Sequence, residues 1–246
     1  MNGILDRVAR SSLDSSYSQF QPKSQMEFFA LRLAQKLGEP AAAKHYAELA
    51  DQYSEVSCLT AFRRAKKNTS RMELPRNFHV ELERLHAKSA NGLSHRRLAA
   101  IRVDRRSVAV APLFGDHLEY TPLLHQLPTA NDKSVSSITT FIRWILERCP
   151  VETAALETVP DSKDFQRTQL TEAVSGVLVS QGISIWQVPK TEILNAFGHP
   201  PLRTRQQVRE IISNIWPGVD GDLSAPLIRD ALALGLYCQT EYLFNL

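Results

Sequence analysis

The chain has 246 residues, of which 43% are hydrophobic and 22% charged, and its net charge is +3. These values are typical of an ordinary globular protein with one large or two modest domains. No apolar run approaches the roughly 18 residues of a transmembrane helix, and residues 1–10 lack the apolar core of a signal peptide. We therefore expect a cytoplasmic protein with no membrane partner. The isolated cysteines Cys58, Cys149 and Cys238 argue against a disulfide framework and a zinc site.

Charge is distributed unevenly along the chain. Residues 1–106 contain 19 Lys and Arg against 11 Asp and Glu, whereas residues 107–246 contain 10 against 15. This polarity suits a protein that holds nucleic-acid phosphate with one region and metal ions with another. Docking of the basic half onto the acidic half explains the same pattern equally well.

Residues 1–95 predict a small helical module that follows a flexible, serine-rich arm. The sequence Ser24-Gln25-Met26-Glu27 is typical of a capping box, and the apolar residues after it predict a helix that ends near Gly38. Further helices are predicted over residues 4–10, 40–53, 55–67 and 79–90. We expect this module to be a surface for a protein partner.

Beyond residue 96 the apolar period changes from helical to strand-like. Three strands joined by tight turns are predicted over residues 98–104, 107–114 and 118–125. Helices and strands then alternate: helix 134–148, strand 153–159, helix 164–181, strand 183–188, and helices 191–197, 204–216 and from 226 onward. This order predicts an α/β domain over residues 96–246, with a five-stranded mixed sheet covered by helices on both faces.

Two acids stand at the ends of predicted elements, about 70 residues apart in the sequence. Glu157 follows the apolar run of the fourth strand, and Asp230 opens the apolar part of the last helix. Acids in these places favour a shared metal site or an acid–base site. A simpler interpretation remains open: Glu157 is a strand-edge charge and Asp230 a first-turn helix charge.

The segment around these acids resembles the RuvC-type Holliday-junction resolvases, which have a ribonuclease H-like fold. The resemblance covers about residues 98–237 and is carried by four motifs. They are residues 155–157 (ALE), 187–193 (QVPKTEI), 202–208 (LRTRQQV) and 228–234 (IRDALAL). It implies that Glu157 and Asp230 are catalytic, metal-binding acids of a Mg²⁺-dependent (or Mn²⁺-dependent) endodeoxyribonuclease.

The sequence departs from that family at two of the four acids. Arg102 stands where the first strand of the family has Asp, and Leu227 stands where the last helix has its other acid. A register shift of two residues keeps a side chain on the same face, so Asp104 is the remaining candidate for the first-strand acid. Two-metal hydrolysis needs carboxylates around two cations, whereas an arginine in their place can hold a phosphate directly.

We therefore predict a nucleic-acid-binding protein with a RuvC-like, catalytically degenerate nuclease domain that acts in DNA processing or within a nucleic-acid complex. We expect the partner to be DNA rather than RNA. The sequence leaves open whether the chain forms a homodimer. The predicted contacts to nucleic acid are Arg102, Lys190, Arg203, Thr204 and Arg205. Two alternatives remain: an active endonuclease that uses the three acids named above, and an assembly protein that kept only the fold.

Overall fold

The structure is a computed structural model that describes residues 21–23, 25–36, 97–114, 117–118, 121–129, 131–159, 164–198, 201–217 and 225–245. The predicted helices over residues 4–10, 40–53, 55–67 and 79–90 lie outside these residues. No helix in the described part of the chain is both long and apolar enough to cross a membrane.

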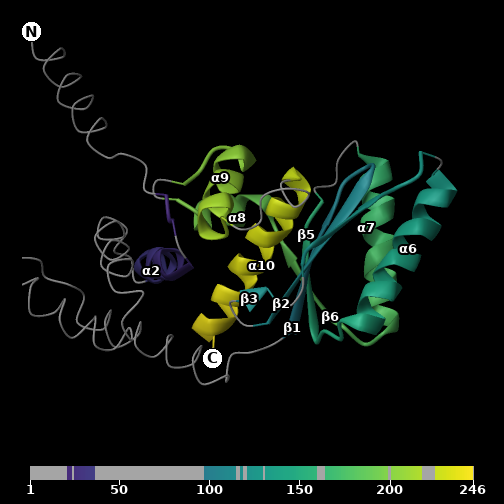
Figure 1. The fold of residues 1–246 in the computed structure, drawn as a ribbon, viewed down its shortest axis with the longest axis horizontal. Helices are drawn as coiled ribbons and strands as arrows, with labels where there is room; N and C mark the ends of the chain where they lie inside the picture. Colours follow the sequence, from purple (N-terminus) through teal and green to yellow (C-terminus); the bar gives the residue numbers. More distant parts are fainter. Residues whose placement is uncertain are drawn as a thin grey trace, which may run out of the picture.

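The sheet has the predicted mixed topology (Figure 1). β1 (Arg97–Val103) pairs antiparallel with β2 (Ser107–Phe114) on one side and parallel with β5 (Thr153–Glu157) on the other. β5 pairs parallel with β6 (Ser184–Val188). β2 pairs antiparallel with β3 (His117–Leu118) and with β4 (Leu123–Gln126). The order β3-β2-β1-β5-β6, with β4 beside β2, confirms the expected arrangement of three antiparallel strand positions followed by parallel ones.

The predicted third strand is divided into β3 and β4, and proline accounts for the interruption. Pro112 of β2 faces the interval between the two segments, because β4 pairs with residues 107–110 and β3 with residues 113–114. Proline has no N–H to donate to a neighbouring strand. Pro122, immediately before β4, also lacks this donor, so pairing resumes only after it.

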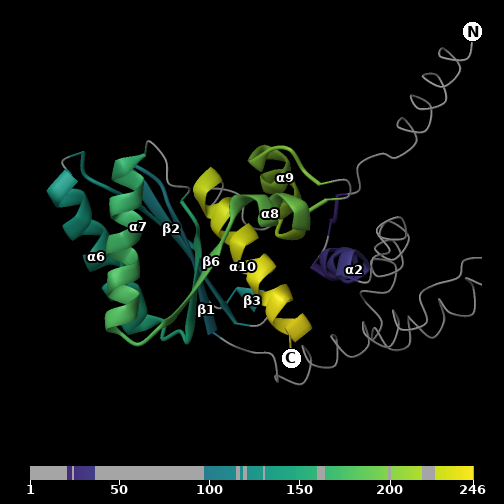
Figure 2. The same ribbon diagram turned by 180° about the vertical axis from the view of Figure 1, so that it is seen from behind.

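Helices cover both faces of the sheet, as predicted. α6 (Asn131–Arg148) and α7 (Phe165–Ser180) pack on one face, where Ile138, Ile142 and Val174 join a buried cluster with the strands. α10 (Pro226–Asn245) crosses the other face, with α8 (Lys190–Ala196) and α9 (Arg205–Ile215) beside it (Figures 1 and 2). The domain therefore has two hydrophobic cores separated by the sheet.

Two glycines mark places where the backbone requires them. Gly182 has φ of 72° at the end of α7, a left-handed conformation that glycine adopts without strain. Gly235 lies where α10 approaches the sheet closely, and a Cβ at this position would overlap the Cδ1 methyl of Leu113. This contact sets how closely the helix can approach β2.

α2 (Gln25–Lys36) confirms the first predicted long helix and packs onto the α8–α10 side of the domain. The rings of Phe28 and Phe197 lie 4.3 Å apart, and Arg32 and Lys36 form ion pairs with Glu241 of α10. The hydrophobic core on the α10 face therefore includes a segment from the range predicted as a separate module. The boundary at residues 95 and 96 stays a prediction, because residues 37–96 lie outside the described part.

Candidate functional site

The register of β1 and β5 places Arg102 beside Glu157. Ile101 is opposite Leu156 in this parallel pair, so the next residue of each strand continues the pairing. Side chains alternate between the faces of a sheet, and Ala100 and Ala155 both belong to the core on the α10 side. Arg102 and Glu157, two positions further, therefore point toward α10.

Asp230 reaches the same point from the beginning of α10. The Arg102 Nε atom lies 3.3 Å from Glu157 Oε2 and 3.9 Å from Asp230 Oδ2. The three side chains are almost completely buried, with exposed fractions of 7% for Arg102, 2% for Glu157 and 4% for Asp230. The arginine that replaces the expected first-strand acid thus lies between the two remaining acids.

Two further arginines come from α9. Arg205 and Arg209 are four residues apart, which places them on one face of the helix. Arg209 donates from Nε and Nη2 to the two carboxylate oxygens of Asp230, both at 2.8 Å. Arg205 donates from Nη2 to Glu157 and from Nη1 to Asp230 Oδ2 at 3.5 Å. Arg205 therefore bridges the two acids.

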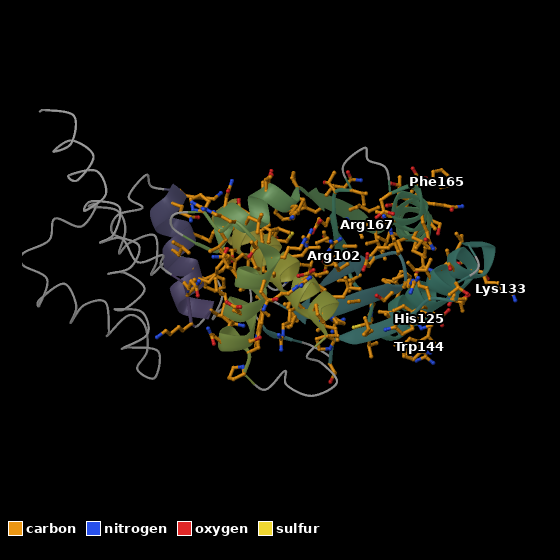
Figure 3. All side chains as sticks on the ribbon, turned by 90° about the horizontal axis from the view of Figure 1, so that it is seen from above. Arg102, His125, Lys133, Trp144, Phe165 and Arg167 are labelled. Atoms are coloured by element: carbon orange, nitrogen blue, oxygen red, sulfur yellow. The ribbon has the colours of Figure 1, made fainter. Side chains whose placement is uncertain are left out.

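The fourth arginine comes from the first turn of α7. Arg167 Nη2 lies 3.3 Å from Glu157 Oε1, and its Nε donates to the carbonyl oxygen of Val103 at 3.1 Å. Figure 3 shows Arg102 and Arg167 near one another in the central part of the molecule. We call the six side chains the arginine cluster: Arg102, Arg167, Arg205, Arg209, Glu157 and Asp230.

The protonation properties of the cluster follow from burial and from its opposite charges. Burial lowers the pKa of Arg102 to about 10, and the nearby Glu157 carboxylate only partly opposes this effect. Burial on its own raises the pKa of Glu157, but Arg102, Arg205 and Arg167 outweigh it, so the pKa lies below the ordinary value. The hydrogen bond to Asp230 raises the pKa of Arg209. Arg102, Arg209 and Glu157 are therefore charged near neutral pH.

The arrangement does not fit a Mg²⁺ site. Every carboxylate oxygen of Glu157 and Asp230 already forms an ion pair with a guanidinium group. Asp104 lies just beyond β1, is exposed, and donates its backbone N–H to the carbonyl oxygen of Ser107. Among the described residues, no three His, Cys, Asp or Glu side chains form a group that could hold a metal ion. The structure therefore brings Glu157 and Asp230 together, and the Asp104 charge also acts on Arg209, where it helps to raise the pKa, but the three acids do not form a metal-binding group.

The predicted nucleic-acid contacts occupy different positions at the cluster. Lys190, Arg205 and Asp230 line one small cavity between α8, α9 and α10. Thr204 caps α9, since its Oγ1 accepts from the backbone N–H of Gln207, and the predicted capping box is confirmed. Arg203 is exposed just before this cap. Arg102 is central but buried.

Sequence reasoning missed Arg167 and Arg209. Arg209 could have been found from its spacing, because it lies one turn after Arg205 on the same helical face. No comparable local signal identifies Arg167, since only the crossover from β5 to α7 brings its guanidinium group back to Glu157.

A cavity of about 350 Å³ adjoins the cluster beside Glu157, between α7 and the ends of β5 and β6. Hydroxyl side chains of α7 line it, and three of them donate to carbonyl oxygens one turn earlier: Thr168, Thr171 and Ser175. Their oxygen atoms therefore remain as hydrogen-bond acceptors, and the charged side chains that line this cavity are Glu157 and Glu172.

The strand order, with one antiparallel meander followed by two parallel crossovers, defines the class of the domain as ribonuclease H-like. The chain is similar to solved structures of RuvC from Thermus thermophilus. One covers 57% of this chain and 92% of RuvC, with 15% identity and a TM-score of 0.47. Another, of RuvC in complex with a Holliday junction substrate, covers 57% and 91%, with 14% identity and a TM-score of 0.48. No protein-family model and no curated protein matches the sequence.

Proposed function

We propose that this domain binds the phosphate backbone of nucleic acid at the arginine cluster and does not cleave it. The observation that carries the proposal is the charge balance, since four guanidinium groups surround two carboxylates and leave a net charge of +2. A two-metal nuclease site has the opposite design, in which carboxylates surround cations. Here the arginines take the place of those cations.

The carboxylates orient the guanidinium groups for an anion. Arg205 and Arg209 are only partly buried, and each is held by charge-assisted hydrogen bonds to Glu157 or Asp230. A guanidinium group presents its N–H donors in a fixed fork that matches two phosphate oxygens. Because four arginines share two acids, donor capacity is left over for a phosphate that approaches from the exposed side of α9.

Residues at the edge of the cluster extend the positive surface. Arg203 and Lys190 are both exposed, at the start of α9 and of α8. Contacts of this kind recognise phosphate and not base sequence, so they supply affinity with little sequence preference. We expect DNA as the ligand before RNA.

The test combines salt-dependent binding with a cleavage assay. Fluorescence anisotropy would follow labelled duplex, single-stranded and branched DNA, and matched RNA, over a range of salt concentrations. Wild-type affinity should fall linearly with the logarithm of salt concentration, and Arg203→Ala should reduce the slope by about 0.9, the value for one lost phosphate contact on B-DNA. Arg143→Ala, an exposed arginine of α6 across the sheet from α9, is the matched control and should leave duplex binding unchanged.

Glu157→Gln separates binding from catalysis. It raises the net charge of the cluster, so duplex affinity should increase at a temperature where circular dichroism shows that the variant is folded. Cleavage by the wild type in Mg²⁺ or Mn²⁺ that Glu157→Gln abolishes would contradict the proposal and establish the endonuclease alternative. Failure to bind any DNA or RNA at low salt would also contradict the proposal. The remaining alternative would then be an assembly protein that kept only the fold.

A further inference from the structure

Three aromatic rings with nearly the same orientation lie between α6 and the edge strand β4. The rings of His125 and Phe141 stack with centroids 4.6 Å apart and planes inclined by 17°. The rings of Phe141 and Trp144 follow at 6.3 Å and 13°. A contact of 2.8 Å between His125 Nε2 and Ser137 Oγ fixes the first ring against the helix. We call these three rings the aromatic ladder.

The rings of the aromatic ladder differ in their relation to the core, because Phe141 packs against the buried cluster whereas Trp144 does not. α6 contributes Ile138, Ile142, Ile145 and Leu146 to the buried cluster under the sheet. Trp144 lies outside that cluster and 42% of its surface is exposed. An exposed indole ring with nearly the same orientation as its neighbours offers a flat surface on which another planar ring can stack.

A groove with a positive border adjoins the aromatic ladder. Its volume is about 410 Å³, and the ladder lines it together with Lys133 and the hydroxyl side chains of Ser136, Ser137 and Thr140. The guanidinium carbon of Arg148 lies 4.3 Å from the centroid of the Trp144 ring, so it covers one face of the indole. Figure 3 shows His125 and Trp144 close together, Lys133 toward the outer edge of the molecule, and Arg102 and Arg167 toward its centre.

We propose that this groove binds an unpaired base of single-stranded nucleic acid, stacked parallel to the aromatic ladder. Every base has a π-face, so stacking on such rings tolerates any sequence. Lys133 lines the same groove, so its ammonium group is available to a phosphate of the bound strand. This inference rests on the proposed function, because it assumes that the chain binds nucleic acid.

Charge complementarity selects a nucleic acid over a protein ligand. The charged side chain that lines the groove is Lys133, and the Arg148 guanidinium lies over the Trp144 ring beside it. A polyanion that also carries planar rings matches both features of the groove, its positive border and its parallel rings. A single strand of nucleic acid with unstacked bases is such a ligand. The arginine cluster on the other side of the sheet lacks aromatic rings, so it supplies phosphate contacts to duplex and single strand alike.

The experiment compares three ligands with wild type and Trp144→Ala in the full chain by fluorescence anisotropy. The ligands are a short single strand of mixed sequence, a blunt duplex of the same length and an abasic single strand. Trp144→Ala should weaken binding of the mixed strand by about 5-fold to 150-fold, the range for one lost base stack. It should change binding of the duplex and of the abasic strand by less than about 2-fold, and Trp144→Phe should retain most of the affinity.

Phe114→Ala is the matched control. Phe114 is 36% exposed and also has an arginine over its ring, with the guanidinium carbon of Arg97 5.7 Å from the centroid, but it lies at the far end of β2. It should leave single-strand affinity unchanged. If the wild type binds nucleic acid and Trp144→Ala behaves like Phe114→Ala, the stacking site is refuted and the proposed function stands. If the wild type binds no nucleic acid, both are refuted.

Discussion

Replacing Glu157 by Gln should destabilise the domain strongly, because this carboxylate compensates three buried or partly buried guanidinium groups. Its side chain is 2% exposed and forms ion pairs with Arg102, Arg167 and Arg205. Removing one partner of a buried ion pair costs about 3–5 kcal/mol, since the remaining charge stays buried without compensation. The amide oxygen still accepts one hydrogen bond, so we expect a loss near 3 kcal/mol.

The assay is urea denaturation followed by far-UV circular dichroism, with thermal unfolding as a second readout. For a domain of this size, a loss of about 3 kcal/mol corresponds to a decrease in Tm of roughly 6–12 °C. Glu147→Gln is the matched control, because Glu147 is exposed and its ion pair with Arg148 spans 3.9 Å. Exposed pairs contribute about 0–1 kcal/mol, so this variant should be nearly unchanged.

The effect should also depend on pH in a defined direction. The arginines hold the pKa of Glu157 below its ordinary value, so the folded state favours the ionised carboxylate. The resulting stability is fully present above the pKa of an unfolded glutamate, about 4.3, and is lost as the pH falls through the lower folded pKa. The difference between wild type and Glu157→Gln should therefore shrink below about pH 4. Equal stability of the two proteins at neutral pH would refute the view that Glu157 holds the arginine cluster together.

Four further predictions concern packing and reactivity. Gly235→Ala should lower the free energy of unfolding by about 1–2 kcal/mol, because the overlap with Leu113 costs more than the gain in helix propensity. Gly176→Ala in α7 meets no atom within 4 Å and should instead gain about 0.5–1 kcal/mol, so equal denaturation midpoints would contradict this account. Phe28→Ala should cost about 3–5 kcal/mol in the main unfolding transition, whereas no effect there would show that α2 folds separately. Burial raises the pKa of the Cys238 thiol, so an aromatic disulfide reagent at about pH 8 should modify it only after unfolding, and rapid native modification would disprove its burial.

Local patterns predicted most of the described elements. The apolar spacing in α7 identified Leu170, Val174 and Val177, and these side chains are buried against the sheet. The turn between β1 and β2 and the capping box at Thr204 were also read correctly, because they depend on residues that are close in the sequence. The division of the third strand was missed, since it depends on where Pro112 of one strand meets another.

The site was predicted only in part, for a physical reason. Glu157 and Asp230 were singled out from their places at strand and helix ends and Arg102 from the family resemblance, and the structure brings the three together. The sequence does not show how many arginines pair with the two acids, because Arg167 and Arg209 reach them from two different helices. Apolar periodicity is a property of neighbours in sequence, whereas the charge balance of a buried site depends on which element ends meet. Only the packing of α7, α9 and α10 around the ends of β1 and β5 turned a pair of candidate acids into a positively charged cluster.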